Sequence, residues 1–358
     1  YCFINKRIKF IMAYTTINKS SSFQNQVIYT GNGSTQSVTG VGFQPDWTWC
    51  KQRNTARNHG LFDAVRGVTK ILYSNDSSGQ ATAATSLTSF NSDGFSCGGE
   101  TETNANGGTY VSWNWKANGA GSANTAGSIN STVSVSATSG FSIVSYTGTG
   151  ANATIGHGLG SVPKMIITKS TGAVAGWGVY HQSLGNTNAL FLEESTATSA
   201  NSVYWNNTSP TSSVFSVGSA GAMNNTNGMI AYCFAEKQGY SKFGSYTGNG
   251  NADGTFVYTG FKPAFVMCKA SSVGGSVGYA WSMFDNKRSS YNIERSQLEA
   301  NTSDAQQTDA SGDIDLLSNG FKFRSSASEN NQSGATYIYM AFAEAPLVGT
   351  NNIPANAR

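Results

Sequence analysis

One ordered set of landmarks occurs three times in this chain, and it constrains the fold more than any other feature. The first landmark is the pentapeptide Tyr-Thr-Gly-x-Gly, which occupies residues 29–33, 146–150 and 246–250. The three copies start roughly one small domain apart. Self-similarity at such a spacing is the sequence signature of a repeat architecture. The chain is therefore expected to use one structural unit three times.

Four further landmarks follow each copy in the same order. A Pro-containing turn leads into an apolar run, and then come an aromatic-rich run, a turn with a short apolar run, and an apolar closing run. Proline at a strand entry fixes the backbone without removing a hydrogen bond of the sheet. The turns contain Pro45, Pro163 and Pro263, the runs after them end at Lys51, Lys169 and Lys269, and the closing runs begin at Thr109, Gly228 and Thr336.

These landmarks predict an all-β chain. The runs are short and rich in β-prone residues, they lack the 3.6-residue period of helices, and 41 Gly suit the tight turns between strands. We predict three tandem β-sandwich repeats of about 100 residues, of the jelly-roll or lectin-like kind. The closing runs are apolar at both parities, which predicts central strands buried on both faces. Units of this length can hold their own cores, so separate modules are expected, with a continuous stack that shares its cores as the alternative.

The same landmarks predict the domain boundaries. Residues 119–130 are rich in Gly, Ser and Ala, which indicates a flexible linker and a loosely tethered first module. Almost no linker separates the second and third modules, so these two are expected to dock. Basic and aromatic residues stop at Met12, so Met12 is expected to be the native start and residues 1–11 not to be native. The predicted segments are an N-terminal extension at 1–22, modules at 23–118, 131–238 and 239–347, and a C-terminal tail at 348–358.

Composition argues against several classes of protein. Only 11% of the residues are charged and the net charge is +3, which argues against nucleic acid and against membrane insertion. Aromatic residues make up 12%, which argues against disorder, and no run reaches the roughly 18 apolar residues of a membrane-spanning helix. Five cysteines form no disulfide framework. The apolar runs around Cys50, Cys233 and Cys268 predict buried free thiols and assembly in a reducing cytoplasm.

Residues that could carry catalysis or bind a metal form no strong pattern. The three histidines lie in no metal-binding or catalytic-triad spacing, which favours structural roles for His59, His157 and His181. We therefore predict no enzymatic activity and no catalytic cofactor. The loop DASGDID offers three carboxylates for a structural calcium ion, with a solvated turn as the alternative: Asp309, Asp313 and Asp315.

Glycan binding is the chemistry that the residues favour most. Sugars bind on an aromatic platform with polar groups at its rim, and Trp205 beside Asn206 and Asn207 is the best exposed candidate. The other paired tryptophans have i, i+2 spacing and are expected in the core: Trp47 with Trp49, and Trp113 with Trp115. The polar loops before the closing runs differ most among the units and are expected to vary a binding surface; they span residues 98–108, 218–228 and 324–334.

The landmarks also carry a family resemblance. Segments such as GFQPDWTWCKQR, HGLFDAVRGVTK, ATIGHGLGSVPKMIITK and TYIYMAFAEAPLVGTNNIPANAR resemble repeat-containing structural proteins of marine tailed bacteriophages, of the cyanophage and pelagiphage kind, which are often described as tail-fibre proteins. The resemblance runs from about Met12 to Arg358. It implies a virion protein, assembled in the host cytoplasm and exposed outside the cell, with other virion proteins as partners, no catalytic residues, and a homotrimeric assembly.

The sequence leaves three functions open. The first is a tail-fibre or receptor-binding adhesin that recognises a host surface glycan or protein. The second is a structural protein that decorates the capsid or tail and binds other virion proteins. The third and least favoured is a polysaccharide-degrading enzyme, because the chain has only 19 acidic residues and several of them lie within the structural landmarks.

Overall fold

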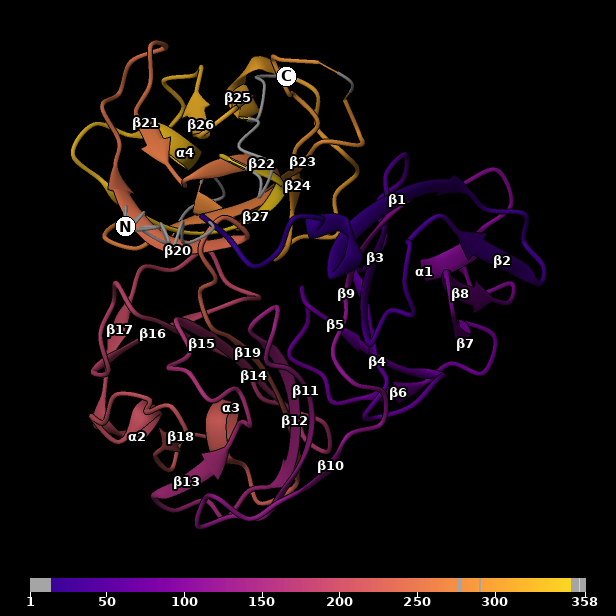
Figure 1. Ribbon diagram of the computed structural model, residues 1–358, viewed down its shortest axis with the longest axis vertical. Coiled ribbons are helices and arrows are strands. Elements are labelled where there is room, and N and C mark those ends of the chain that lie inside the picture. Colours follow the sequence, from indigo (N-terminus) through magenta and orange to yellow (C-terminus); the bar gives the residue numbers. More distant parts are fainter. Residues whose placement is uncertain (1–13, 276–278, 290, 349–353, 355–358) are drawn as a thin grey trace, which may run out of the picture.

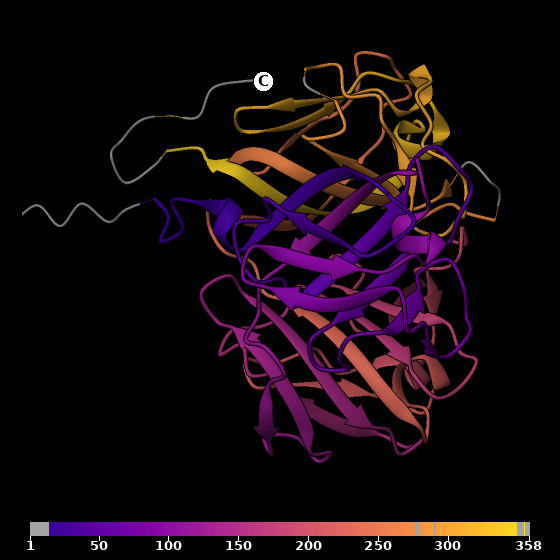
Figure 2. The ribbon, with the colours of Figure 1, turned by 90° about the vertical axis from the view of Figure 1, so that its right-hand side faces the viewer.

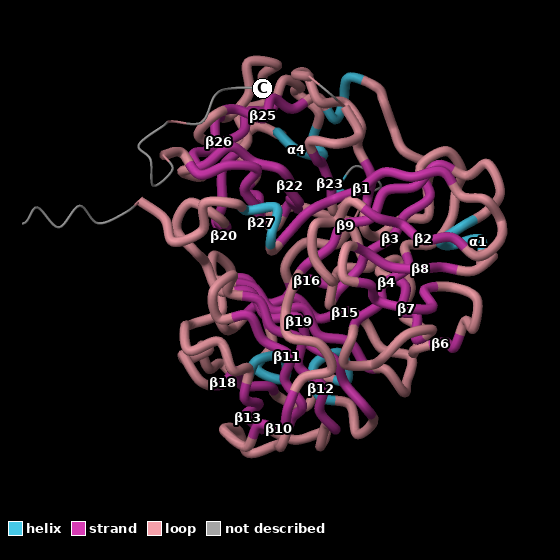
Figure 3. The backbone as a smooth tube through the Cα atoms, turned by 45° about the vertical axis from the view of Figure 1, so that its right-hand side comes forward, coloured by secondary structure: helices cyan, strands magenta, loops and turns pink. Residues whose placement is uncertain are grey.

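The computed structural model describes residues 14–275, 279–289, 291–348 and 354. The named strands pair antiparallel in six sheets, and the helices are single turns (Figure 3). The predicted all-β class is confirmed. The expected start at Met12 and most of the predicted C-terminal tail lie outside the described residues. Within the described part of the chain, no helix is long and apolar enough to cross a membrane.

The chain forms three consecutive units, and unit 1 is a sandwich of a larger and a smaller sheet (Figure 1). The larger sheet has the strand order β1-β9-β3-β4-β5-β6, and the smaller has the order β2-β8-β7. The elements of unit 1 are the 3-10 helix η1 (Ser20–Ser22), β1 (Gln24–Thr30), β2 (Gln36–Thr39), β3 (Trp47–Gln52), β4 (Gly60–Asp63), β5 (Lys70–Tyr73), β6 (Ala81–Thr82), β7 (Leu87–Asn91), β8 (Gly94–Cys97), α1 (Thr101–Asn104) and β9 (Thr109–Trp115).

Unit 2 repeats this plan with two extra strands, β10 and β11, at one edge of its larger sheet. The larger sheet has the order β10-β11-β12-β19-β14-β15-β16-β17, and the smaller sheet pairs β13 with β18. The elements of unit 2 are β10 (Ser122–Asn124), β11 (Ser131–Ser136), β12 (Phe141–Thr147), β13 (Ala153–Gly156), β14 (Met165–Ser170), β15 (Trp177–His181), β16 (Asn188–Phe191), β17 (Ser199–Ala200), α2 (Ser202–Trp205), β18 (Val214–Val217), α3 (Gly221–Asn224) and β19 (Gly228–Phe234).

Unit 3 has the same plan with a longer excursion after its aromatic-rich strand. The larger sheet has the order β20-β27-β22-β23-β24, and the smaller has the order β21-β26-β25. The elements of unit 3 are β20 (Ser241–Thr247), β21 (Phe256–Tyr258), β22 (Phe261–Ala270), β23 (Ser282–Asp285), β24 (Leu298–Glu299), the 3-10 helix η3 (Ala310–Gly312), β25 (Ile314–Leu317), β26 (Gly320–Phe323), α4 (Ser328–Asn331) and β27 (Thr336–Pro346).

The closing strand of each unit lies inside the larger sheet, as the sequence predicts. β9 lies between β1 and β3, and β19 and β27 take the same place in units 2 and 3. Almost every residue of these strands is buried. A strand that is apolar at both parities suits this position because it packs side chains on both of its faces.

One central core joins the three units, which corrects the expectation of separate modules. The larger sheets face one another around the centre (Figure 1), and their inward side chains belong to a single buried cluster. The ring of Trp47 stacks on Tyr232 of unit 2 with centroids 4.3 Å apart. Trp115 packs edge-on against Phe265 of unit 3 at 5.7 Å. The tryptophan pairs on β3 and β9 are therefore core residues, as expected, but the core that they fill is shared by all three units.

The predicted flexible linker at 119–130 is ordered and fixes unit 1 to unit 2. Residues 122–124 form β10, which pairs with β11 at the edge of the larger sheet of unit 2. The carboxylate of Asp46 accepts hydrogen bonds from the N–H groups of Ala117 at 2.6 Å and Gly119 at 3.0 Å. The first module is thus not loosely tethered, because its chain exit is held by both units.

The pentapeptide Tyr-Thr-Gly-x-Gly ends β1, β12 and β20 and begins the turn after each of them. In unit 2, Tyr146 Oη donates to the carbonyl of Met223 in α3 at 2.5 Å, and a Cβ on Gly148 would collide with the carbonyl oxygen of Asn225. Gly150 has a φ of 68°, a conformation that favours glycine. The tyrosine and both glycines therefore each have a local structural cause. The corresponding tyrosines Tyr29 and Tyr246 make the same hydrogen bond at 2.7 and 2.8 Å.

A buried asparagine from the one-turn helix holds this turn in each unit. In unit 2, Asn224 Oδ1 accepts from the N–H of Thr149 at 2.9 Å, and Asn224 Nδ2 donates to the carbonyl of Gly218 at 2.9 Å. Asn104 and Asn331 occupy the same place in units 1 and 3. Each variable polar loop therefore contains an asparagine that holds the turn in place. We expected these loops only to vary a binding surface; they span residues 98–108, 218–228 and 324–334.

Candidate functional site: a tyrosine-lined pocket beside the unit junctions

The aromatic platform expected at Trp205 is not exposed. Trp205 ends the single turn of α2, and its ring is 1% exposed, packed edge-on against Tyr180 with centroids 5.7 Å apart. Asn206 and Asn207 have φ values of 52° and 47° and form the left-handed turn that ends the helix. The polar residues after Trp205 thus reverse the chain instead of forming the rim of a sugar site, and this prediction is wrong.

The three carboxylates expected to bind calcium do not converge. Asp309 caps η3, where its Oδ1 accepts from the N–H of Ser311 at 2.8 Å. Asp313 pairs with Arg295 at 2.7 Å, and Asp315 lies 3.5 Å from Arg324. Within the described residues, no three His, Cys, Asp or Glu side chains are arranged to hold a metal ion. Asp309 thus lies in a turn, as the alternative prediction has it, and Asp313 and Asp315 form ion pairs with arginines.

The lysines that end the Pro-entry runs form a cyclic set of contacts between units. Lys169 is fully buried, and its Nζ donates to the carbonyls of Ala175 at 2.7 Å and of Ser77 in unit 1 at 2.8 Å. Burial lowers the pKa of Lys169 to about 8, although Glu193 and Asp76 partly oppose this shift. Each unit therefore places the ammonium group of one lysine against main-chain carbonyl groups of the preceding unit, and unit 3 takes that place for unit 1. The equivalent contacts are Lys51 to Ser303 at 3.3 Å and Lys269 to Thr196 at 2.9 Å.

A second set of junctions lies at the end of the aromatic-rich strand. Asp63 Oδ2 accepts from the hydroxyl of Tyr232 in unit 2 at 2.8 Å and pairs with Arg66 at 2.5 Å. Asp285 Oδ2 in unit 3 accepts from Trp113 Nε1 of unit 1 at 2.9 Å. His181 occupies the same position in unit 2. It pairs with Met165, the first residue of β14, just as Asp63 pairs with Trp47, the first residue of β3. These side chains join neighbouring units around the core.

The histidines have main-chain or core partners, in accord with structural roles. His181 Nε2 lies 3.1 Å from the carbonyl of Tyr339, and burial lowers the pKa of His181 to about 4. His157 lies 3.1 Å from the carbonyl of Thr211. His59 Nδ1 accepts from Trp49 Nε1 at 2.9 Å. The prediction of buried free thiols is confirmed for Cys50, Cys233 and Cys268, and Cys97 is also buried and free.

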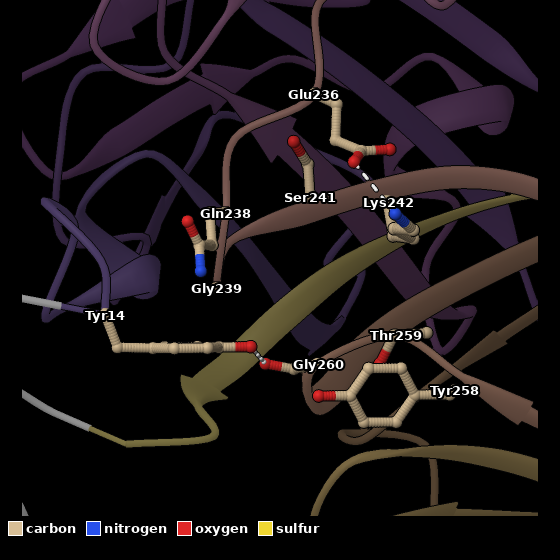
Figure 4. Close-up of a pocket in the computed structure, with 9 residues that line it drawn as sticks. All are labelled: Tyr14, Glu236, Gln238, Gly239, Ser241, Lys242, Tyr258, Thr259 and Gly260. Carbon is tan, nitrogen blue, oxygen red and sulfur yellow. Dashed lines mark hydrogen bonds and ion pairs between the residues drawn. The ribbon is translucent and has the colours of Figure 1, made fainter.

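The best candidate for a ligand site is a pocket of about 370 Å³ at the junction of units 2 and 3 (Figure 4). Three segments build it: the N-terminal segment at Tyr14, the connection at 236–242, and the turn from Tyr258 to Gly260. Tyr14 Oη donates to the carbonyl of Gly260 at 2.6 Å, which fixes the N-terminal segment on unit 3. The site therefore forms only when the N-terminal segment packs against unit 3.

The pocket combines two phenols with polar groups at its other side. Tyr258 is 54% exposed, and its ring lies beside Tyr14 and Gly260 in Figure 4. Glu236 lies opposite, where it pairs with Lys242 at 2.9 Å. Partial burial and then the hydroxyl of Tyr258 raise the pKa of Tyr14 to about 12, so this phenol stays protonated at neutral pH, donates its proton to Gly260 and can accept a hydrogen bond. Gln238 and Ser241 add an amide and a hydroxyl.

A comparison with protein families matches residues 19–346 to a family described as Domain of unknown function (DUF7483). The chain belongs to the DUF7483 family. The match begins one residue before η1 and ends with β27, so this DUF7483 domain comprises all three units and their shared core. No curated protein matches the chain.

Sequence reasoning missed the pocket of this DUF7483 domain for a physical reason. Its residues come from segments around positions 14, 240 and 259, and no local pattern connects them. The one available signal was the short polar stretch after the apolar strand β19, which carries Glu236, Gln238 and Lys242. The inter-unit lysines had a clearer signal, because a Lys recurs at the end of the same apolar run in every unit.

Proposed function

We propose that this chain is a bacteriophage virion protein of the tail-fibre or receptor-binding type, and that it recognises a carbohydrate of the host surface. The observation that carries the binding part of the proposal is the pocket of Tyr14 and Tyr258 with its polar rim. The virion part rests on the resemblance of the repeated landmarks to phage structural proteins. The proposal assigns no catalytic step to the chain.

The pocket has the chemistry that a sugar requires. An exposed phenol ring offers a face for the C–H groups of a pyranose, and carboxylate, amide and hydroxyl groups can exchange hydrogen bonds with its hydroxyls. Glu236 and Gln238 supply these groups within the same pocket as Tyr258. A volume of about 370 Å³ suits one or two sugar rings. A neutral or amino sugar is favoured over an acidic one because Glu236 lies in the wall.

A glycan array tests the binding part with the whole chain. We expect the wild type to bind at least one host-type glycan, and Tyr258→Ala to weaken that binding about tenfold, since an aromatic contact contributes on the order of 1.4 kcal/mol. Tyr291→Ala is the matched control, because Tyr291 is 77% exposed and is not among the residues that line the pocket. Equal losses in both variants, or no glycan bound by the wild type, would contradict the proposal.

The second candidate is a protein that decorates the capsid or tail and binds other virion proteins. It is favoured by the shared core and the buried inter-unit contacts, which give a rigid body of low charge. Gold-labelled antibody on intact particles separates the two candidates. Label at the fibres or tail tip supports the receptor-binding protein, and label over the head or along the tail shaft supports the decorating protein.

Homotrimeric assembly stays a prediction from the resemblance. One chain already arranges three units around a common core, so a trimer is not needed to bury these apolar side chains. Mass photometry of the full chain measures the assembly directly. A trimer mass would support the tail-fibre expectation, whereas a monomer mass would leave the threefold arrangement internal to the chain.

A further inference from the structure

Two glutamates of unit 3 occupy a position that is apolar in unit 2. Glu299 ends β24 opposite Ser282, and Phe191 ends β16 opposite Gly178 in the same register. Glu329 is the second residue of α4, where α3 has Ala222. The site is therefore apolar and at the edge of the core in unit 2, whereas unit 3 has two carboxyl groups there.

Both carboxyl groups are buried and share one amide partner. Glu299 is 6% exposed and Glu329 is 8% exposed. Gln297 Nε2 donates to Oε1 of Glu329 and lies 3.4 Å from Oε1 of Glu299. Gln307 Nε2 donates to the same Glu299 oxygen at 3.3 Å. Glu299 Oε2 is buried with no hydrogen-bond donor among the described residues, which is costly for an ionised carboxylate.

Within the described residues, the groups that act most strongly on Glu329 are acidic, and His59, whose pKa is lowered by burial, hydrogen-bonds to the main chain of Glu299. The ionisable groups that act on Glu329 are Glu299 from β24 and Asp309 from η3, both acidic. The Cys268 thiol from β22 interacts with Glu329 as well. Burial, followed by the hydrogen bond and the charge of Glu299, raises the pKa of Glu329 to about 9. At neutral pH one proton therefore remains on the pair, and it can occupy the gap at Glu299 Oε2 as an O–H···O bond.

We propose that Glu299 and Glu329 share this proton and form a pH-sensitive latch that holds α4 against β24. With the proton present, the pair is singly charged and internally hydrogen-bonded. Without it, two negative charges meet in a buried site and repel each other. This inference does not depend on the proposed function.

The latch has a mechanical consequence for unit 3. Glu329 lies two residues before Asn331, whose Nδ2 donates to the carbonyl of Ser325 at 2.9 Å and whose Oδ1 holds the turn at Asn249. Release of α4 would loosen that turn. Because the pKa of Glu329 is higher in the folded chain than in the unfolded chain, the stabilisation is complete below the unfolded pKa and is lost as the pH rises through the folded value.

Hydrogen exchange across pH tests the latch on the full chain. Rates are corrected for the intrinsic pH dependence of exchange and compared for wild type, Glu329→Gln and Glu299→Gln between pH 7 and pH 10. We expect protection of residues 325–335 in the wild type to fall at least tenfold through about pH 9. Glu329→Gln, which keeps a hydrogen bond without a titrating proton, should stay flat, and Glu299→Gln, which removes the acidic neighbour but leaves Glu329 buried, should move the fall to lower pH. Glu102→Gln is the matched control, because Glu102 has the same helix position in unit 1 and should leave the wild-type profile unchanged. The same pH dependence in wild type and both Gln variants would overturn the latch.

Infrared spectroscopy and a metal titration complete the test. The wild type should show at pH 7 the band of a protonated carboxylic acid, and Glu329→Gln should lack it. Absence of the band from the wild type would overturn the proposal. So would a higher melting temperature on addition of Ca²⁺ that Glu329→Gln loses, since a cation would then occupy the place assigned to the proton.

Discussion

Substitution of Asp285 by alanine should destabilise the protein more than any single surface change. Asp285 and Arg288 are fully buried and pair at 2.6 Å. The carboxylate also accepts from the N–H of Lys287 at 2.9 Å and from Trp113 Nε1 of unit 1 at 2.9 Å. Alanine removes all of these contacts and leaves the Arg288 guanidinium, whose Nη1 already has no hydrogen-bond partner in the described part of the chain, without its counter-ion.

The expected loss can be estimated from the burial of the pair. Removal of one partner from a buried ion pair costs about 3–5 kcal/mol, because the other charge stays buried and uncompensated. An unfolding entropy of about 2.1 cal/mol/K per residue gives about 0.75 kcal/mol/K for 358 residues that unfold together. The melting temperature of Asp285→Ala should therefore fall by about 4–7 °C.

Differential scanning calorimetry at pH 7 measures this loss and its cause. Asp285→Ala with Arg288→Met removes both charges and should recover most of the melting temperature, since an apolar pair can replace a buried ion pair at little cost. Asp253→Ala is the control, because Asp253 pairs with Lys322 while its side chain is 77% exposed, and it should not measurably change the melting temperature. A loss of less than 1 °C in Asp285→Ala, or a double variant no better than the single one, would refute the reasoning.

The same pair predicts a dependence on acid. Burial alone would raise the pKa of Asp285, but the charge and hydrogen bonds of Arg288 outweigh it and leave the pKa below its ordinary value. The stabilisation is therefore present above the unfolded pKa of an aspartate and is lost as the pH falls through the folded value. The gap in melting temperature between wild type and Asp285→Ala should narrow in strong acid. A gap that widens there would contradict this sign.

Three further predictions concern the clamps and the cooperativity of the fold. Asn224→Ala leaves several buried main-chain groups unsatisfied and should cost about 2–4 kcal/mol in chemical denaturation, whereas the exposed Asn227→Ala should be near neutral, and equal effects would dismiss the clamp. Lys169→Met should have a lower free energy of unfolding than the wild type at all pH values. This difference should grow between pH 8 and pH 10, because the lowered pKa of Lys169 makes the wild type more stable as the pH rises there, and a constant difference would contradict the sign. The wild type should melt in one calorimetric transition, since one core spans all units, and two resolved transitions would show independent modules.

Much of the secondary structure could be predicted because short stretches of sequence determine it. Pro45 and Pro163 precede strands that lie where expected, whereas Pro263 lies within β22 at a shift of its register. The closing runs are the buried inner strands of their sheets. The shared core could not be predicted in the same way. An apolar strand face has the same sequence pattern whether it packs on its own second sheet or on a neighbouring unit. The sequence pattern therefore predicted that Trp47 is buried, but it could not predict that Tyr232 of the next unit covers its ring.

The candidate site was predicted less well, because exposure and convergence are tertiary properties. Asn206 and Asn207 suggested a wet surface at Trp205, yet they form a left-handed turn that directs the ring inward. Asp309 and Asp313 are close in sequence, yet one caps a helix and the other meets Arg295.

The differences between the units follow one rule at the junctions around the core. An aspartate with an arginine occurs where the next unit presents a side-chain donor, namely Tyr232 opposite Asp63 and Trp113 opposite Asp285. In the third junction, strand register places Met340 at the donor position, and a thioether cannot donate a hydrogen bond. The acidic residue is there replaced by His181, which can donate to a main-chain carbonyl. The three units are thus copies in backbone, while each junction side chain is matched to the neighbour that it contacts.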